Sequence, residues 1–70
     1  MFDSEHTISV LREALLLSPD NVPLRRHLAT TLMHTGRPGE AEQELRQLVA
    51  LDPVDTGIRL ALAEAFEQQG

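Results

Sequence analysis

Three glutamates at alternate positions, Glu40, Glu42 and Glu44, come closest to catalytic machinery in this chain by type and spacing. Neighbouring carboxylates can serve as general acid and base when their surroundings separate their pKa values. These three, however, stand at the start of an expected helix, where acidic side chains interact favourably with the helix dipole. We therefore interpret them as structural residues of that helix.

The histidines do not have the spacing of a metal site. His27 and His34 are seven residues apart, which corresponds to about 10 Å along a helix and is too far to share one ion. Two ligands on one helix normally stand four residues apart. His6 lies near the chain end and is expected to be exposed to solvent. The sequence therefore predicts no metal ligands.

The residues that could act as nucleophiles are equally unsupported. The chain has no cysteine, which excludes thiol nucleophiles, thiolate metal sites and disulfides. Ser4, Ser9 and Ser18 lack the glycine-flanked setting of a hydrolase nucleophile, and no glycine-rich phosphate-binding loop is present. We predict that the chain is not an enzyme and that it binds no cofactor.

Charge and hydropathy limit the classes of partner. The net charge is −5, from eleven acidic residues and six basic residues that are all arginines. Nucleic acid is not an expected partner, since its binding needs concentrated positive charge, and a helix-turn-helix DNA-binding protein is disfavoured. No apolar run approaches the roughly 20 residues of a membrane span, and residues 1–5 do not resemble a secretory signal. We expect a cytoplasmic protein with no membrane partner.

The chain matches itself at an offset of 34 residues. Identical residues recur in register at apolar and turn positions: Leu11 and Leu45, Leu17 and Leu51, Pro19 and Pro53, Leu28 and Leu62, Ala29 and Ala63, and Gly36 and Gly70. Chance rarely places prolines, glycines and apolar residues in register together, so the pattern predicts an internal repeat.

Apolar residues follow helical spacing in four segments. We place the helices at about residues 4–17, 23–35, 38–51 and 56–69. Pro23 and Pro38 suit a first helical turn, and Gly36 suits a left-handed helix end. Asp55 can cap the fourth helix. The connections are short, so consecutive helices are expected to be antiparallel.

Large, small and turn positions follow a characteristic order within residues 22–55. The residues at these positions are Leu28, Ala29, Leu32, Gly36, Ala41, Leu45, Leu48 and Pro53. This order resembles one full copy of the tetratricopeptide repeat. Residues 1–21 resemble the second helix of a preceding copy, and residues 56–70 resemble the first helix of a following one. The resemblance implies one all-α domain over residues 1–70, in which antiparallel helical hairpins stack as a short right-handed solenoid.

Three alanines, Ala29, Ala41 and Ala63, are expected to permit close helix approach, with Ala41 at the tightest crossing. Small side chains permit helices to approach, and the Leu, Ile and Phe neighbours should fill the surrounding grooves. The pattern therefore predicts that all three alanines are packed between helices.

Three residues depart from the family pattern. Arg25 and Arg59 stand where the family often has an aromatic residue, and Thr7 stands where it has a small alanine. We expect each arginine to lay its methylene stem along the apolar seam while its charged head stays in water.

The resemblance also implies a concave groove lined by the first helix of each pair. The residues expected on this face are Arg26, Thr30, Met33, His34, Leu60, Glu64 and Glu67. Arg26 would meet a carboxylate of a bound peptide, with Met33 and Leu60 as adaptable apolar contacts; the alternative is an ordinary solvated helix face. The expected function is a protein-protein interaction module that binds a peptide or helical segment of a partner protein.

A second function class stays open. Gly70 falls where the family's next helix would begin, so the apolar face around Leu62 and Phe66 is expected to lack cover. We expect either a longer parent chain or self-association through this C-terminal helix. In the first case the segment could be the N-terminal regulatory or assembly part of a larger enzyme, such as an ATPase.

Overall fold

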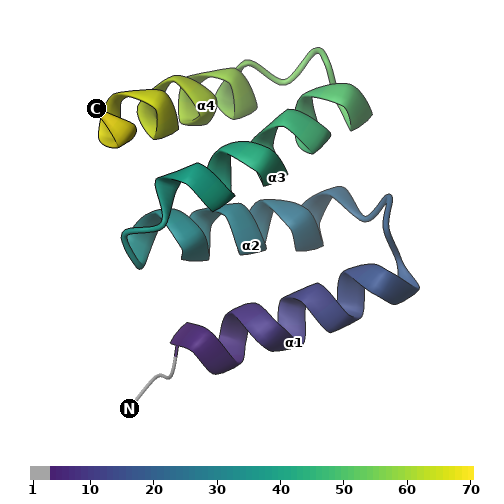
Figure 1. Cartoon of the computed structure of the whole chain (residues 1–70). Coiled ribbons are helices and arrows are strands. Elements are labelled where there is room, and N and C mark those ends of the chain that lie inside the picture. The colour runs from purple at the N-terminus through teal and green to yellow at the C-terminus, as the bar shows by residue number, and fades with distance from the viewer. Residues whose placement is uncertain (1–3) are drawn as a thin grey trace.

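The chain folds as a stack of four α-helices. The computed structural model describes residues 4–70, and its helices are α1 (Ser4–Leu17), α2 (Val22–His34), α3 (Pro38–Leu51) and α4 (Thr56–Gln69). Each helix runs opposite to the one before it and packs against the next (Figure 1). The predicted all-α fold of antiparallel hairpins is confirmed, and only α2 shifts, by one residue at each end. Residues 1–3, where the expected first partial repeat begins, lie outside the described residues.

Side chains just before α2 and α4 fix where these helices begin. The side-chain oxygen of Asn21 accepts the N–H of Leu24 at 3.1 Å. Asp55 Oδ1 accepts the N–H groups of Gly57 at 2.8 Å and of Ile58 at 3.4 Å. These bonds satisfy backbone donors that have no partner within the helix. The predicted cap at Asp55 is confirmed, and Asn21 does the same for α2.

The turn between α2 and α3 depends on Gly36, whose φ of 75° is in the left-handed region. The N–H of Gly36 donates to the carbonyl of Met33 at 3.2 Å, and the N–H of Arg37 donates to that of Leu32 at 2.9 Å. This pair of bonds is the Schellman motif that ends many helices. Because α3 starts at Pro38, the missing proline N–H costs nothing there.

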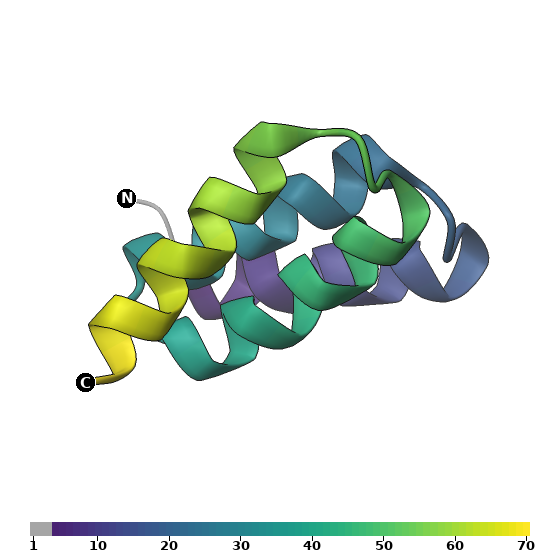
Figure 2. The same cartoon turned by 90° about the horizontal axis from the view of Figure 1, so that it is seen from above.

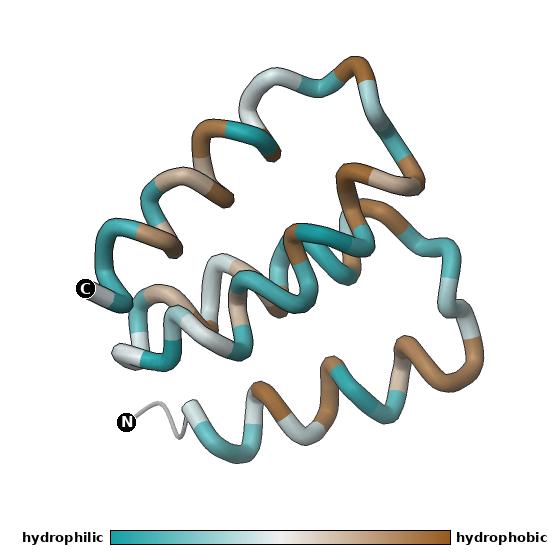
Figure 3. The backbone as a smooth tube through the Cα atoms, turned by 45° about the horizontal axis from the view of Figure 1, so that its top comes forward, coloured by the Kyte–Doolittle hydropathy of each residue, from teal (hydrophilic) through white to brown (hydrophobic). Residues whose placement is uncertain are grey.

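The core is centred on α2 and α3, which have a helix on each side. Its most deeply buried side chains, each 0% exposed, include Leu28, Leu32, Ala41 and Leu48. Figure 3 shows hydrophobic positions recurring along all four helices instead of gathering in one run. Each buried leucine stabilises the fold by roughly 1.5–3 kcal/mol. Ala29 and Ala41 lie in this core as predicted, at 2% and 0% exposure.

Ala63 is not packed between helices, and this prediction is wrong. Ala63 is exposed, while Ala65, two residues later, is 0% exposed at the contact of α4 with α3. The reason is that α4 is covered by α3 alone within the described chain, whereas Ala29 on α2 has helices on both sides. The small residue that allows α4 to approach α3 is therefore Ala65.

The guanidinium group of Arg25 was predicted to lie in water, and this prediction is also wrong. Its side chain is 15% exposed. One terminal nitrogen donates to Glu44 at 2.7 Å and the other to the carbonyl of Pro19 at 2.9 Å. The head is enclosed because the turn before α2 and an acid on α3 both bind it. Arg59 repeats half of this arrangement, donating to the carbonyl of Pro53 at 2.8 Å while it stays exposed.

Replacing Ala41 by leucine should destabilise the fold. Ala41 is 0% exposed where α3 meets α2 and α1, so added methylenes would overpack the crossing and cost roughly 1–3 kcal/mol. Chemical denaturation measures this loss in the free energy of unfolding. Ala50→Leu is the matched control, because Ala50 is exposed on the same helix. Equal stability of the two variants would show that the crossing is looser than described.

A pair of glycine substitutions should act in opposite directions. Gly36→Ala forces a side chain into the left-handed region and should cost roughly 1–2 kcal/mol. Gly39 is helical, and an added Cβ would meet Gln69 Oε1 at an ordinary 3.6 Å, so Gly39→Ala should gain up to about 1 kcal/mol. Thermal unfolding followed by circular dichroism compares them. A Gly36→Ala variant as stable as the parent would contradict the assigned turn.

Candidate functional site

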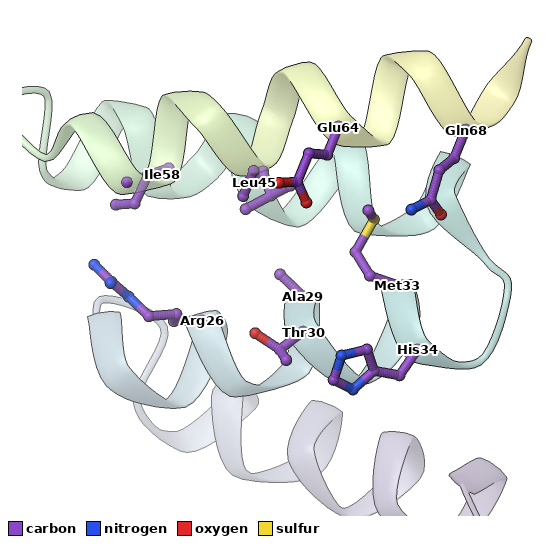
Figure 4. A pocket seen from close by; sticks show the side chains of 11 residues that line it. Arg26, Ala29, Thr30, Met33, His34, Leu45, Ile58, Glu64 and Gln68 are labelled. Carbon is purple, nitrogen blue, oxygen red and sulfur yellow. The ribbon is translucent and has the colours of Figure 1, made fainter.

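A hollow of about 470 Å³ lies between α2 and α4. It is lined by Arg26, Ala29, Thr30, Met33, His34, Leu45, Gly57, Ile58, Ala61, Glu64 and Gln68. In the view from above, α4 crosses over the stack at an angle (Figure 2). In Figure 4, Arg26 and Met33 point from α2 toward the space under α4, and Glu64 and Gln68 point toward it from α4. We call this hollow the α2–α4 groove.

Five of the seven residues predicted for the concave face line the α2–α4 groove. These are Arg26, Thr30, Met33, His34 and Glu64. Leu60 and Glu67 do not line it, although both are exposed, Leu60 at 67%. The structure therefore brings the predicted α2 residues together with one of the three predicted on α4.

The repeat explains why Leu60 and Glu67 lie elsewhere. They stand 34 residues after Arg26 and Met33, so they occupy the same flank of α4 that these two occupy on α2. A groove between two helices is lined by facing flanks, however, and the flank of α4 that faces α2 runs through Gly57, Ala61, Glu64 and Gln68. The predicted pair lies on the flank that turns away from α2.

The floor of the groove consists of apolar residues that were expected in the core or were not predicted at all. Ala29, Leu45 and Ile58 are 2%, 3% and 2% exposed, and Ala61 is half-buried beside them. Leu45 reaches the groove from α3, beneath the two walls. Ala61 could have been predicted from its spacing. It lies one turn before Glu64 and one turn after Gly57 and Ile58, so it shares their face of the helix.

The rim carries charge at two points, one at an end of the floor and one near its middle. Arg26, 47% exposed, forms an ion pair with Asp55 next to the start of α4, while Glu64 extends from the middle of α4. Arg26 is therefore already partly neutralised, because one of its terminal nitrogens binds Asp55. Its other N–H groups have no partner among residues 4–70, so they can donate to a second carboxylate.

Asp55 connects the groove to the fold. The hydrogen bond from Arg26 is the largest cause that holds the pKa of the Asp55 carboxyl below its usual value; burial opposes it, and the N–H of Gly57 assists it. The same carboxylate caps α4. One side chain thus positions both the start of α4 and the guanidinium at the rim.

The three alternate glutamates of α3 form separate ion pairs, and only Glu40 lies in the first turn of the helix. Glu44 pairs with Arg25 at 2.7 Å, and Glu42 pairs with Arg46 at 2.8 Å. Glu40 binds Arg37 and, at 3.2 Å, Arg12 of α1. Glu42 also accepts a hydrogen bond from Gln69 of α4 at 2.7 Å, so Glu40, Glu42 and Glu44 connect α3 to α1, α4 and α2 respectively.

These contacts set the direction of two pKa shifts. The hydrogen bond from Arg37 lowers the pKa of Glu40, and the hydrogen bond from Gln69 lowers that of Glu42. Both acids therefore stay ionised to lower pH than a free glutamate. A lowered pKa is unsuited to a general acid at neutral pH, which must carry a proton to donate.

The described chain has neither a metal-binding cluster nor a membrane-spanning helix. Residues 4–70 contain no group of three or more side chains able to hold a metal ion. His27 and His34 are both exposed on α2. None of the four helices has the length and hydropathy that crossing a bilayer requires.

Comparison with known proteins identifies the family. The family model described as tetratricopeptide repeat matches residues 5–65. No curated protein and no solved structure gives a significant match to the chain. The match covers parts of all four helices, including those that form the groove.

Removing the Arg26 guanidinium should raise the pKa of Asp55 toward its usual value. The carboxylate stabilises the folded state above the pKa of an unfolded aspartate, about 3.9, and this stability is lost as pH falls through the lower folded value. In Arg26→Gln the folded pKa lies closer to the unfolded one, so this stabilisation should be smaller and its loss should be complete at a higher pH, while the onset, which the unfolded pKa sets, stays the same. A carbon-detected NMR titration of Asp55 measures the shift directly.

Arg12→Gln is the matched control, since Arg12 pairs with Glu40 at 3.2 Å and neither residue lines the α2–α4 groove. It should leave the titration of Asp55 unchanged. An identical Asp55 pKa in the parent and in Arg26→Gln would show that the ion pair does not form in solution.

Proposed function

Because the chain belongs to the tetratricopeptide repeat family, we propose that its α2–α4 groove binds a peptide or helical segment of a partner protein. Domains of this family generally serve as protein-protein interaction modules, and the proposal assigns that activity to one surface of this chain. The observation that carries it is the groove itself, which combines an apolar floor with a charged and polar rim.

The chemistry of the groove indicates the kind of segment that fits. The floor offers Ala29 and Ile58, and beside it the flexible, polarisable Met33 of α2 adapts to apolar side chains of different shapes. The unpaired N–H groups of Arg26 favour an acidic side chain or a terminal carboxylate at one end. Glu64 favours a basic residue farther along. The expected ligand is therefore a short, largely apolar segment with an acidic group at one end and a basic residue near the position of Glu64.

We also propose that the chain associates with itself through α4. Phe66 is 47% exposed, and Leu62, one turn before it on the same face of the helix, is half-buried. Adjacent apolar side chains that a helix leaves uncovered are typical of protein contacts. Phe66 is held in place from one side, because the Arg46 guanidinium lies 5.2 Å from the centre of its ring. Its opposite side is open within the described chain.

Selection from a displayed random peptide library against the immobilised chain would test the groove. Peptides that bind the parent should lose at least about tenfold in affinity, or ~1.4 kcal/mol, with Arg26→Gln combined with Met33→Ala. Glutamine at position 26 avoids placing a second carboxylate against Asp55. Because Met33 is half-buried, Thr30→Arg is a second variant, which blocks the groove from an exposed position.

The control combines Arg12→Gln with Val54→Ala. It removes the same charge and a comparable apolar side chain at positions outside the groove, so it should bind the selected peptides as the parent does. Circular dichroism verifies that all variants are folded. Equal binding by the control and both groove variants would refute the groove as the binding surface.

A further inference from the structure

One face of α4 lacks the cover that the equivalent face of α2 has. On α2, Leu28 and Leu32 are each 0% exposed, packed between α1 and α3. Their equivalents 34 residues later are Leu62, which is half-buried, and Phe66, which is 47% exposed. The difference arises because α3 follows α2 in the stack, whereas no described helix follows α4.

One face of α1 is also uncovered, namely the face equivalent to the one that α3 packs against α2. On α3, Leu45 and Leu48 are 3% and 0% exposed. The residues 34 positions earlier, Leu11 and Ala14, are half-buried, and Val10 beside them is 47% exposed. Here the cause is that α2 precedes α3, whereas no described helix precedes α1. Thus α1 presents the face that α3 uses to pack against α2.

These two open faces are the two halves of one contact, which the molecule already contains between α2 and α3. We propose that α1 of a second copy packs against α4, in the place that α3 takes against α2. This inference rests on the self-association proposed above and specifies its two surfaces. The arrangement continues the existing stack, because α1 of the second copy would take the place of a helix two 34-residue repeats after α1 of the first copy.

The side chains of the proposed contact keep the character of the existing one. From the α2–α3 contact to the proposed one, Leu32 is replaced by the larger Phe66 and Leu48 by the smaller Ala14. Thr7 replaces Ala41. The phenylalanine and the threonine add volume and the alanine removes it, so the three changes partly offset one another. Most of the remaining positions stay apolar in both contacts.

Arg59 gives the proposal a specific test. Its equivalent Arg25 binds both a turn carbonyl and Glu44, whereas Arg59 binds the carbonyl of Pro53 and no carboxylate among residues 4–70. In the proposed contact, the residue that takes the place of Glu44 is Val10 of the second copy. The packing therefore lacks one acid, and that acid can be supplied by mutation.

The proposed contact uses different surfaces on the two copies. Such a contact does not close by two-fold symmetry, so it produces rings or open chains whose size grows with concentration. A dimer formed by α4 against α4 would instead stop at two copies. The two arrangements therefore differ in stoichiometry as well as in the residues that they use.

Sedimentation velocity over a concentration series, with folding verified by circular dichroism, tests the arrangement. Val10→Glu should tighten association about two- to fivefold by pairing with Arg59 of the next copy, and added salt should reduce this gain. Val10→Arg should weaken association by a similar factor. Adding Arg59→Glu to Val10→Arg should restore it. Gln47→Glu, an exposed control on α3, should give no gain.

The outcomes separate this inference from the proposals on which it builds. A dimer whose affinity does not respond to position 10 would support self-association through α4 but overturn the head-to-tail contact. Weakening by Val10→Glu, as expected if the valine acts by hydrophobicity alone, would overturn it too. A monomer at all concentrations, for the parent and for Val10→Glu, would overturn both. Peptide selection tests the groove independently of all these results.

Discussion

The packing of α2 between α1 and α3 is the contact on which the rest of this structure depends. A stacked helix has two sides to cover, and each neighbour covers one. Leu28 and Leu32 are fully buried because α2 has both neighbours, and this requires α3 to approach closely at Ala41. The outer helices have one neighbour each within the described chain, which leaves Val10 and Phe66 open. Burial therefore follows position in the stack more than residue type.

The same stacking produces the groove. Because α3 packs against both α2 and α4, its Leu45 supplies a floor while the other two helices supply facing walls. Asp55 then fixes the relation between the walls, since it caps α4 and also binds Arg26 of α2. The same carboxylate therefore links the rim of the proposed binding groove to the stability of α4, so a substitution of Arg26 affects both.

Local sequence signals were sufficient for the elements. The helix ends follow from Asp55, Gly36 and the prolines, whose effects act within a few residues. Periodic leucines likewise identified the central core. The misplaced residues depend instead on which neighbours are present. Arg25 is enclosed by an acid on another helix, and Ala63 is exposed because no described helix lies beyond it.

The residues that line the groove could be predicted on α2 but less well on α4, because lining a groove also depends on the neighbouring helix. A repeat offset keeps a residue on the same flank of its own helix, but the two walls of a groove are opposite flanks. Leu60 and Glu67 are therefore equivalent to Arg26 and Met33 without facing them. In the proposed head-to-tail stack, α2 of the next copy would follow α4 as α4 follows α2. Leu60 and Glu67 would then line a second groove, between copies, and assembly would extend the binding surface as well as cover the open faces.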